Sequence, residues 1–263
     1  MLSKITKRDM IEYFELCSTE TDIDVARAVE LTLHAEKTGE AIGEYGTSLA
    51  KWNNSLSGEP EYSCYSDPYY FCDVWLCWKH CSRQYLKNLS SKKSFGKLLL
   101  DIFSEVKTVA DIGCGPGYST AALTQLFPNA NVIGTNFEDS PQFRIATKLS
   151  KEYGFSVIPE LTEQTDLIFA SEYFEHIQEP IAHVNDIIDR CDPTYLVIAN
   201  AFGVANVIGH FDTYKVGNLE VSSKKISRMF NDNMRRRGYF KLTTNCWNGR
   251  PVVWSKYDSV LDI

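Results

Sequence analysis

The chain has 263 residues, of which 44% are apolar and 23% are charged. The length is enough for one well-packed α/β domain with an additional layer, and the composition argues against a disordered or fibrous protein. The net charge of −7 argues against a protein that grips long nucleic acid by its phosphates. The N-terminus lacks the apolar core of a signal peptide, and no apolar run is long enough to span a bilayer. The sequence therefore predicts a cytoplasmic protein whose eight cysteines are mostly reduced thiols.

The first hundred residues are predicted to be mainly helical. Apolar residues recur there at spacings of three and four, which is typical of helices, and one segment rich in Asn, Ser, Gly and Pro favours a loop. The predicted helices cover residues 8–36, 69–89 and 95–103, and the loop covers 53–68. We expect residues 1–94 to form a helical, aromatic-rich cap that contributes to the substrate region.

From residue 106 onward, short apolar runs alternate with helical patterns. The predicted strands cover residues 106–112, 131–135, 155–158, 166–170 and 195–199, and the helices cover 118–127, 139–153, 179–190 and 222–237. Two late strands, 239–245 and 251–257, are predicted to form a hairpin around Asn248-Gly249. The fold class is thus α/β: a Rossmann-like, seven-stranded, mostly parallel sheet with an antiparallel C-terminal hairpin and a helical N-terminal cap.

A glycine-rich loop, Asp111-Ile-Gly-Cys-Gly-Pro-Gly117, joins the first of these strands to the next helix. Glycine permits positive φ and lets a ligand approach the backbone, and the N–H groups at the start of the helix then face that ligand. A dinucleotide-binding loop would have two residues before its third glycine, to seat a pyrophosphate. Here one residue intervenes, and Asp111 would repel a pyrophosphate. The acid suits a ligand with an amino group, such as the methionine end of S-adenosylmethionine.

Over about residues 95–260 the chain resembles the class I S-adenosylmethionine-dependent methyltransferase superfamily. A second matching element is Val132-Ile-Gly-Thr-Asn136, where the superfamily usually has an acid that holds the ribose hydroxyls. Asn136 departs from that pattern, since an amide bonds a hydroxyl less strongly than a carboxylate does. The resemblance implies that residues 95–263 form the cofactor-binding domain. The implied cofactor-binding residues are Asp111, Gly113, Cys114, Gly115, Gly117, Asn136, Phe137, Glu160, Leu161 and Ser171.

A cluster of acids and a histidine follows the fourth predicted strand. In one helical turn, Glu172, Glu175 and His176 would share a face, where a divalent cation would relieve their repulsion. His210 follows the fifth strand and reaches the same end of the sheet. The pattern is similar to that of ubiquinone-pathway O-methyltransferases and small-RNA 3′-end 2′-O-methyltransferases. That resemblance implies that Glu172, Glu175, His176 and His210 are catalytic ligands of Mg²⁺ or Mn²⁺. The alternative is a glutamate that caps a helix without metal.

The stretch from Tyr62 to Cys81 is rich in aromatic residues and cysteine. Its aromatic side chains either pack the cap or line a pocket for a flat or apolar substrate. Cys72, Cys77, His80 and Cys81 are candidate zinc ligands, but their spacing fits no common zinc module. Cysteines within a helix are more often small buried apolar residues.

These features together predict a methyltransferase that uses S-adenosylmethionine. The expected reaction is O-methylation of a small-molecule or terminal hydroxyl acceptor, assisted by the metal if it is bound. A metal-independent N- or C-methyltransferase, with Glu172 or His176 as general base, is the first alternative. The second is a cofactor-binding subunit without catalysis that regulates a partner, although the intact glycine loop argues against it.

Overall fold

Two helices, α1 (Lys7–Ser18) and α2 (Val25–Thr38), occupy the segment in which the sequence predicts one. The Thr6 and Asp24 side chains each accept a hydrogen bond from a backbone N–H of the following first turn, and such N-caps stabilise a helix start. The prediction of one helix over 8–36 is therefore wrong, because Asp24 begins a second helix after a short turn. This computed structural model describes residues 1–40, 42, 46–56, 58, 60–94, 97–204, 207–242, 244, 246 and 249–257.

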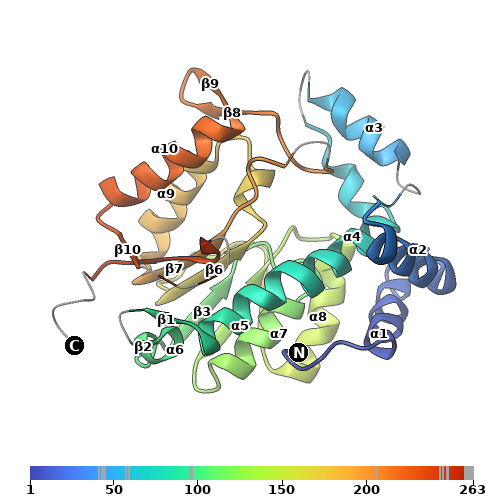
Figure 1. Cartoon of the computed structure of the whole chain (residues 1–263), viewed down its shortest axis with the longest axis horizontal. Coiled ribbons are helices and arrows are strands. Elements are labelled where there is room, and N and C mark those ends of the chain that lie inside the picture. Colours follow the sequence, from blue (N-terminus) through green and yellow to red (C-terminus); the bar gives the residue numbers. More distant parts are fainter. Residues whose placement is uncertain are drawn as a thin grey trace.

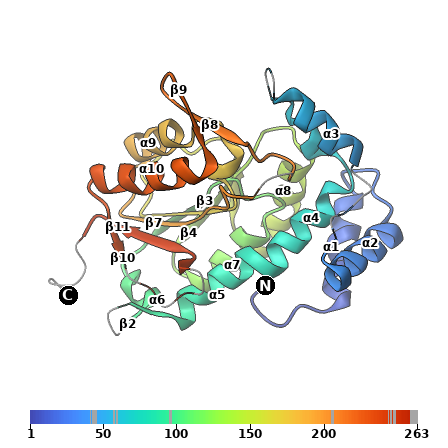
Figure 2. The ribbon, with the colours of Figure 1, turned by 45° about the horizontal axis from the view of Figure 1, so that its top comes forward.

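One long helical segment, residues 70–91, forms the centre of the cap (Figure 2). It consists of α4 (Tyr70–Cys77), the wider π turn η3 (Trp78–Ser82) and α5 (Arg83–Ser91). The predicted helix over 69–89 is thus confirmed. The predicted loop over 53–68 is wrong in part, because α3 (Gly46–Ser55) extends into it and the short 3₁₀ helix η2 (Tyr62–Ser66) ends it.

The central sheet has seven strands in the order β10-β11-β7-β6-β3-β4-β5. Its parallel strands are β3 (Thr108–Asp111), β4 (Asn131–Thr135), β5 (Ser156–Ile158), β6 (Leu167–Ser171) and β7 (Tyr195–Ala199). Strand β11 (Val252–Ser255) is antiparallel to β7, and β10 (Phe240–Leu242) is antiparallel to β11. The predicted fold class is confirmed. Because β3 pairs with β4 on one side and β6 on the other, the loops after β3 and β6 flank the switch point of the sheet.

Helices cover both faces of this sheet (Figure 1). On one face α5 packs against α7 (Tyr118–Leu126), which in turn packs against α8 (Pro141–Tyr153). On the other face α9 (Pro180–Cys191) packs against α10 (Ser223–Arg236). The central strands β3 and β6 are almost wholly buried between these layers, which explains their continuous apolar runs.

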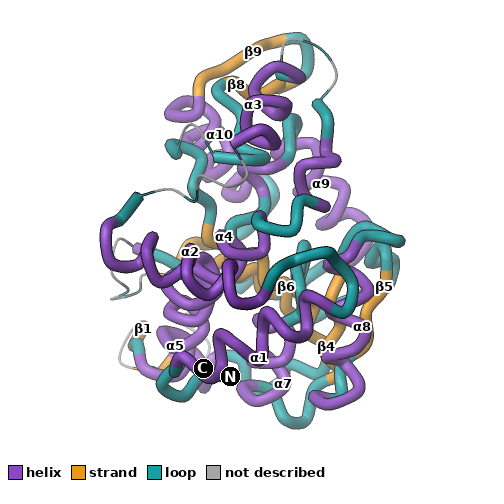
Figure 3. The backbone as a smooth tube through the Cα atoms, turned by 90° about the vertical axis from the view of Figure 1, so that its right-hand side faces the viewer, coloured by secondary structure: helices purple, strands orange, loops and turns teal. Residues whose placement is uncertain are grey.

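Three segments differ from the sequence prediction or lie partly outside the described residues. In place of a helix over 95–103, the structure has β1 (Lys93–Ser94), β2 (Lys97–Leu98) and the short α6 (Leu99–Ile102), while Phe95 lies outside the described residues. The hairpin of β8 (Thr213–Val216) and β9 (Leu219–Ser222) is not predicted; it lies at the same end of the molecule as α3 (Figure 3). The predicted turn at Asn248 and the strand end at Asn245 also lie outside the described residues.

Within the described part of the chain, no helix combines the length and the apolar character that crossing a bilayer requires.

Candidate functional site

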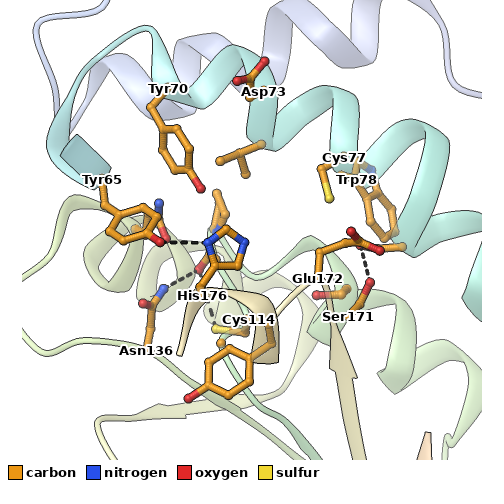
Figure 4. Close-up of a pocket in the computed structure, with 18 of the residues that line it drawn as sticks. Tyr65, Tyr70, Asp73, Cys77, Trp78, Cys114, Asn136, Ser171, Glu172 and His176 are labelled. Atoms are coloured by element: carbon orange, nitrogen blue, oxygen red, sulfur yellow. Dashed lines mark hydrogen bonds between the residues drawn. The ribbon is translucent and has the colours of Figure 1, made fainter. Parts of the chain in front are cut away.

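A cavity of about 870 Å³ opens at the carboxyl ends of the parallel strands, between the sheet and the cap. The glycine loop after β3 lines one side, together with residues that follow β4, β6 and β7. The cap supplies the opposite wall, from which Tyr65 and Tyr70 face the interior (Figure 4), and Asp73 also lines the cavity. The cavity therefore lies where ligands bind on open α/β sheets, and it is closed by a segment that is distant in sequence.

The three glycines of the loop all have positive φ: 68° at Gly113, 54° at Gly115 and 90° at Gly117. Only glycine adopts such angles routinely. A Cβ atom on Gly113 would overlap the ring of Tyr173, whereas one on Gly115 would meet nothing closer than 4.0 Å. Gly113 is thus required for packing, while Gly115 leaves space in the cavity for a ligand.

The Asp111 side chain lies at the end of β3, where it is buried. Its Oδ2 atom accepts hydrogen bonds from the hydroxyls of Ser119, at 2.6 Å, and Thr120, at 2.7 Å. Burial raises the pKa of Asp111 to about 6, although these two bonds oppose the shift. The acid therefore holds the first turn of α7 against the glycine loop. Contact with an amino group of the cofactor stays a prediction.

The buried position of Asp111 predicts a pH dependence of stability. Its folded-state pKa of about 6 exceeds the ordinary value of 3.8, so its contribution to stability is complete below about pH 4 and is lost as the pH rises through 6. Two pKa units correspond to roughly 3 kcal/mol. Asp111→Asn removes this loss. Between about pH 4 and pH 7, the free energy of unfolding of the variant should therefore rise relative to that of the wild type by roughly 3 kcal/mol. Urea titrations measure it, and a pH-independent difference between the two proteins would refute the explanation.

The other predicted cofactor residues fall into two groups. Cys114, Asn136, Phe137 and Ser171 line the cavity, but Glu160 and Leu161 do not. The Asn136 amide donates to the Gly115 carbonyl at 2.9 Å, so it braces the glycine loop. Glu160 instead pairs with Arg190 at 2.7 Å on the surface. The structure thus brings the first group to the cavity and leaves the second group outside it.

Glu172 is not among the residues whose possible ligand atoms all lie within 4.8 Å of one another. Its backbone has a positive φ of 52°, which is uncommon for a residue with a Cβ atom. Its Oε1 atom accepts a hydrogen bond from the Tyr85 hydroxyl at 3.0 Å, and its carboxyl group lines the cavity (Figure 4). Burial raises its pKa above the ordinary value. The side chain is thus held toward the cap.

Glu175, His176 and His210 do come together: one potential ligand atom from each lies within 4.8 Å of the others. Glu175 is fully buried in the short helix η4 (Phe174–His176). Its Oε1 atom accepts a hydrogen bond from the Ala201 N–H at 2.7 Å, and Oε2 has no partner. Burial raises the pKa of Glu175 well above its ordinary range and lowers that of His176 to about 3. His176 is therefore a neutral imidazole at pH 7.

Hydrogen bonds orient the two histidine rings. The Nδ1 atom of His210 lies 2.9 Å from the Val204 carbonyl, to which it donates as N–H, so Nε2 is left as the acceptor nitrogen. The Nδ1 atom of His176 lies 2.8 Å from the Tyr65 hydroxyl. The two rings are perpendicular, with centroids 4.7 Å apart. This arrangement can hold a cation or direct a base into the cavity.

Sequence reasoning did not single out Tyr65 for a role at the site. It lies 111 residues before His176, and only the cap brings its hydroxyl to that ring. Its position in the aromatic stretch from Tyr62 to Cys81 was the available signal. Both interpretations of that stretch have examples: Tyr70 and Trp78 line the cavity, whereas Trp75 is buried against Tyr13, with ring centroids 4.8 Å apart.

The cap cysteines do not form a zinc site in the described part of the chain, where the grouping of possible ligands is the one at Glu175. Cys72 is buried and directs its thiol to the Ala28 carbonyl. Cys77 and Cys81 line the cavity. The interpretation of these residues as small apolar side chains holds for Cys72.

The family model described as a methyltransferase domain matches residues 82–203. Residues 82–203 are thus similar to this family. The match agrees with the enzyme class predicted from the glycine loop. The match includes the glycine loop and Glu175, but it ends before His210. The domain boundary predicted between residues 94 and 95 stays a prediction.

One curated protein matches part of the chain. The chain is 30% identical to the trans-aconitate 2-methyltransferase of Rhodopseudomonas palustris (strain BisB18) over 91 residues, which are 33% of this chain and 35% of that protein. The chain thus matches about a third of the relative's length.

Two solved structures are similar to the chain at a lower sequence identity. The mitomycin 7-O-methyltransferase MmcR has a TM-score of 0.48 and 15% identity, over 88% of this chain and 67% of that one. The plantazolicin methyltransferase BpumL, in complex with S-adenosylhomocysteine and a pentazolic desmethylPZN analog, has a TM-score of 0.39 and 15% identity over 60% and 61% of the two chains. Neither score is high enough to bear on the acceptor.

Proposed function

We propose that this chain transfers the methyl group of S-adenosylmethionine to an oxygen atom of a small-molecule acceptor. The observation that carries the proposal is that one cavity is lined both by the glycine loop and by the two histidines of the Glu175–His176–His210 cluster. Gly115 leaves room for the cofactor on one side, and the aromatic wall of the cap faces it on the other. A cofactor and an acceptor held in this way would be positioned for direct transfer, and positioning is a large part of such catalysis.

We further propose that Glu175, His176 and His210 hold a Mg²⁺ or Mn²⁺ ion. The donors suit such an ion, because carboxylate and imidazole are ligands of hard and borderline cations. The Oε2 atom of Glu175 is buried without a hydrogen-bond partner, which is costly unless something binds it. The Val204 carbonyl fixes the tautomer of His210 that offers Nε2. A bound divalent ion would lower the pKa of an acceptor hydroxyl.

The residues of the chain itself perform three tasks in this mechanism. The glycine loop and Asn136 hold the cofactor side of the cavity, since the Asn136 amide supports the Gly115 carbonyl. Tyr65 orients the His176 ring, and burial keeps that ring neutral, so its free nitrogen accepts a ligand or a proton. The cap aromatics cover the acceptor and exclude water from the reacting atoms.

A metal-independent methyltransferase with His176 as general base is the second candidate. The observation that favours it is the 2.8 Å contact between Tyr65 and His176, which orients the ring without any ion. A neutral imidazole of low pKa is a weak base. This candidate therefore suits an acceptor whose proton is already acidic.

Metal removal separates the two candidates. We expect chelator to reduce methyl transfer by about a hundredfold or more and Mn²⁺ to restore it, because the ion would activate the acceptor. His210→Ala should raise the Mn²⁺ concentration for half-maximal activity by about tenfold or more, with little change in the affinity for S-adenosylhomocysteine. His34→Ala, at an exposed position on α2, serves as the control. Full activity after chelation would refute the metal and leave the second candidate.

A further inference from the structure

The cavity wall contributed by the cap is built from aromatic rings. Tyr62 and Tyr65 stack with centroids 6.1 Å apart and 10° between their planes. The ring of Tyr70 meets that of Tyr65 edge-on at 5.2 Å, and Phe137, from the loop after β4, lies 6.4 Å from Tyr62. All four residues line the cavity. Surfaces of this kind favour flat, apolar ligands.

The charged side chains of the cavity are acidic. Asp73, Asp111 and Glu172 line it, and no lysine or arginine does so among the residues that the structure describes. Arg250 lies near the site, but outside the lining, beside Tyr85 and Glu172, which raise its pKa. Arg250 does not line the cavity, so its charge lies outside the wall that a ligand would contact.

Burial disfavours negative charge on Asp111, even though hydroxyl groups donate to it. Burial raises the pKa of Asp111 to about 6, although Ser119 and Thr120 both donate to its carboxylate. A carboxylate on an acceptor at the aromatic wall would lose water in the same way, with acids and not cations around it. Contacts between like charges therefore weaken the binding of such an acceptor.

We infer that the acceptor of this methyltransferase is a flat molecule that is uncharged or positively charged, and that acceptors carrying a carboxylate are excluded. This inference rests on the proposed function and specifies its substrate class. The inferred acceptor therefore differs from trans-aconitate, the acceptor in the name of the curated relative that matches part of the chain. A divalent ion would not reverse it, because Glu172 lies beside Glu175 and the two carboxylates would balance the charge of the ion.

Three hydroxynaphthalenes of matched shape test the inference: 2-naphthol, 6-hydroxy-2-naphthoate and 6-(aminomethyl)-2-naphthol. Their affinities for the protein saturated with S-adenosylhomocysteine are measured by calorimetry, with chelator and again with Mn²⁺, and trans-aconitate is included. We expect the neutral and cationic probes to bind, and the two carboxylate-bearing ligands to bind at least about tenfold more weakly. Binding of S-adenosylhomocysteine itself is scored separately, and its failure would contradict the proposed function instead.

A charge variant at the rim of the cavity provides the matched control. Val204 lines the cavity and is 47% exposed, and its hydrogen bond with His210 is made by its backbone carbonyl oxygen. Val204→Arg should improve the affinity for 6-hydroxy-2-naphthoate about tenfold relative to Val204→Gln, which adds bulk without charge.

Two results would overturn the inference. One is an affinity of the wild type for 6-hydroxy-2-naphthoate that equals or exceeds its affinity for 2-naphthol. The other is the absence of binding of all three probes to a protein that binds S-adenosylhomocysteine normally.

Discussion

Gly115→Arg is expected to abolish binding of S-adenosylmethionine and S-adenosylhomocysteine, with a loss of affinity of about a hundredfold or more. A Cβ atom at Gly115 would point into open space, with Val74 4.0 Å away as its nearest neighbour. A long side chain can therefore be accommodated without unfolding the loop, but it would occupy the part of the cavity proposed for the cofactor. Calorimetric titration with S-adenosylhomocysteine measures the effect, and circular dichroism reports whether the fold is kept.

Gly115→Ala shows whether a loss of cofactor affinity in Gly115→Arg comes from the space that arginine fills or from backbone strain. The φ of 54° at this position costs a residue with a Cβ atom about 1–2 kcal/mol, and both variants bear that cost. The alanine variant should therefore lose some stability but keep most of its affinity. If alanine weakens binding as much as arginine does, the loop conformation and not the space beside Gly115 governs binding. If Gly115→Arg binds normally, the cofactor lies elsewhere.

Gly209→Ala is expected to reduce methyl transfer by about a hundredfold or more while leaving cofactor binding nearly unchanged. The added Cβ atom would overlap both the Tyr65 hydroxyl and the Nδ1 atom of His176. One methyl group would thus displace the ring from its partner and from His210, and a displacement of about 1 Å at a reacting group can cost a hundredfold in rate. Steady-state kinetics and calorimetry on the same preparation separate the two effects.

Gly217→Ala is the matched control for Gly209→Ala. Gly217 also has a positive φ, 57°, but a Cβ atom there meets nothing within 4 Å. It lies between β8 and β9, outside the cavity lining. This variant should share the strain and retain activity. Equal losses in both variants would attribute the effect to strain, and an active Gly209→Ala enzyme would show that the position of His176 is unimportant for transfer.

The order of strands and helices after residue 106 could be predicted because its signals are local. The strands 131–135 and 195–199 are short apolar runs, and their predicted bounds are those of β4 and β7. Glycines that require positive φ mark the loop after β3. Patterns within about ten residues therefore sufficed for the fold of the domain. The hairpin of β8 and β9 was missed, since its residues show no comparable apolar run.

Contacts between distant segments could not be predicted in this way. The sequence placed Glu172, Glu175 and His176 on one helical turn, but in the structure the Tyr85 hydroxyl holds Glu172 toward the cap. The partner of His176 is Tyr65, which lies 111 residues earlier. Each pairing depends on where the cap docks, and no periodicity in the chain encodes that distance.

The sequence by itself thus determined the class of sheet, the glycine loop and the end of the sheet at which the cavity opens. Strand periodicity and glycine conformation are properties of neighbouring residues, so they can be read from the chain. The tertiary structure decided which of the predicted ligands come together, which tyrosines reach them and which charges line the cavity. These features arise when the cap packs on the sheet, because burial and the contacts between distant residues exist only in the folded chain.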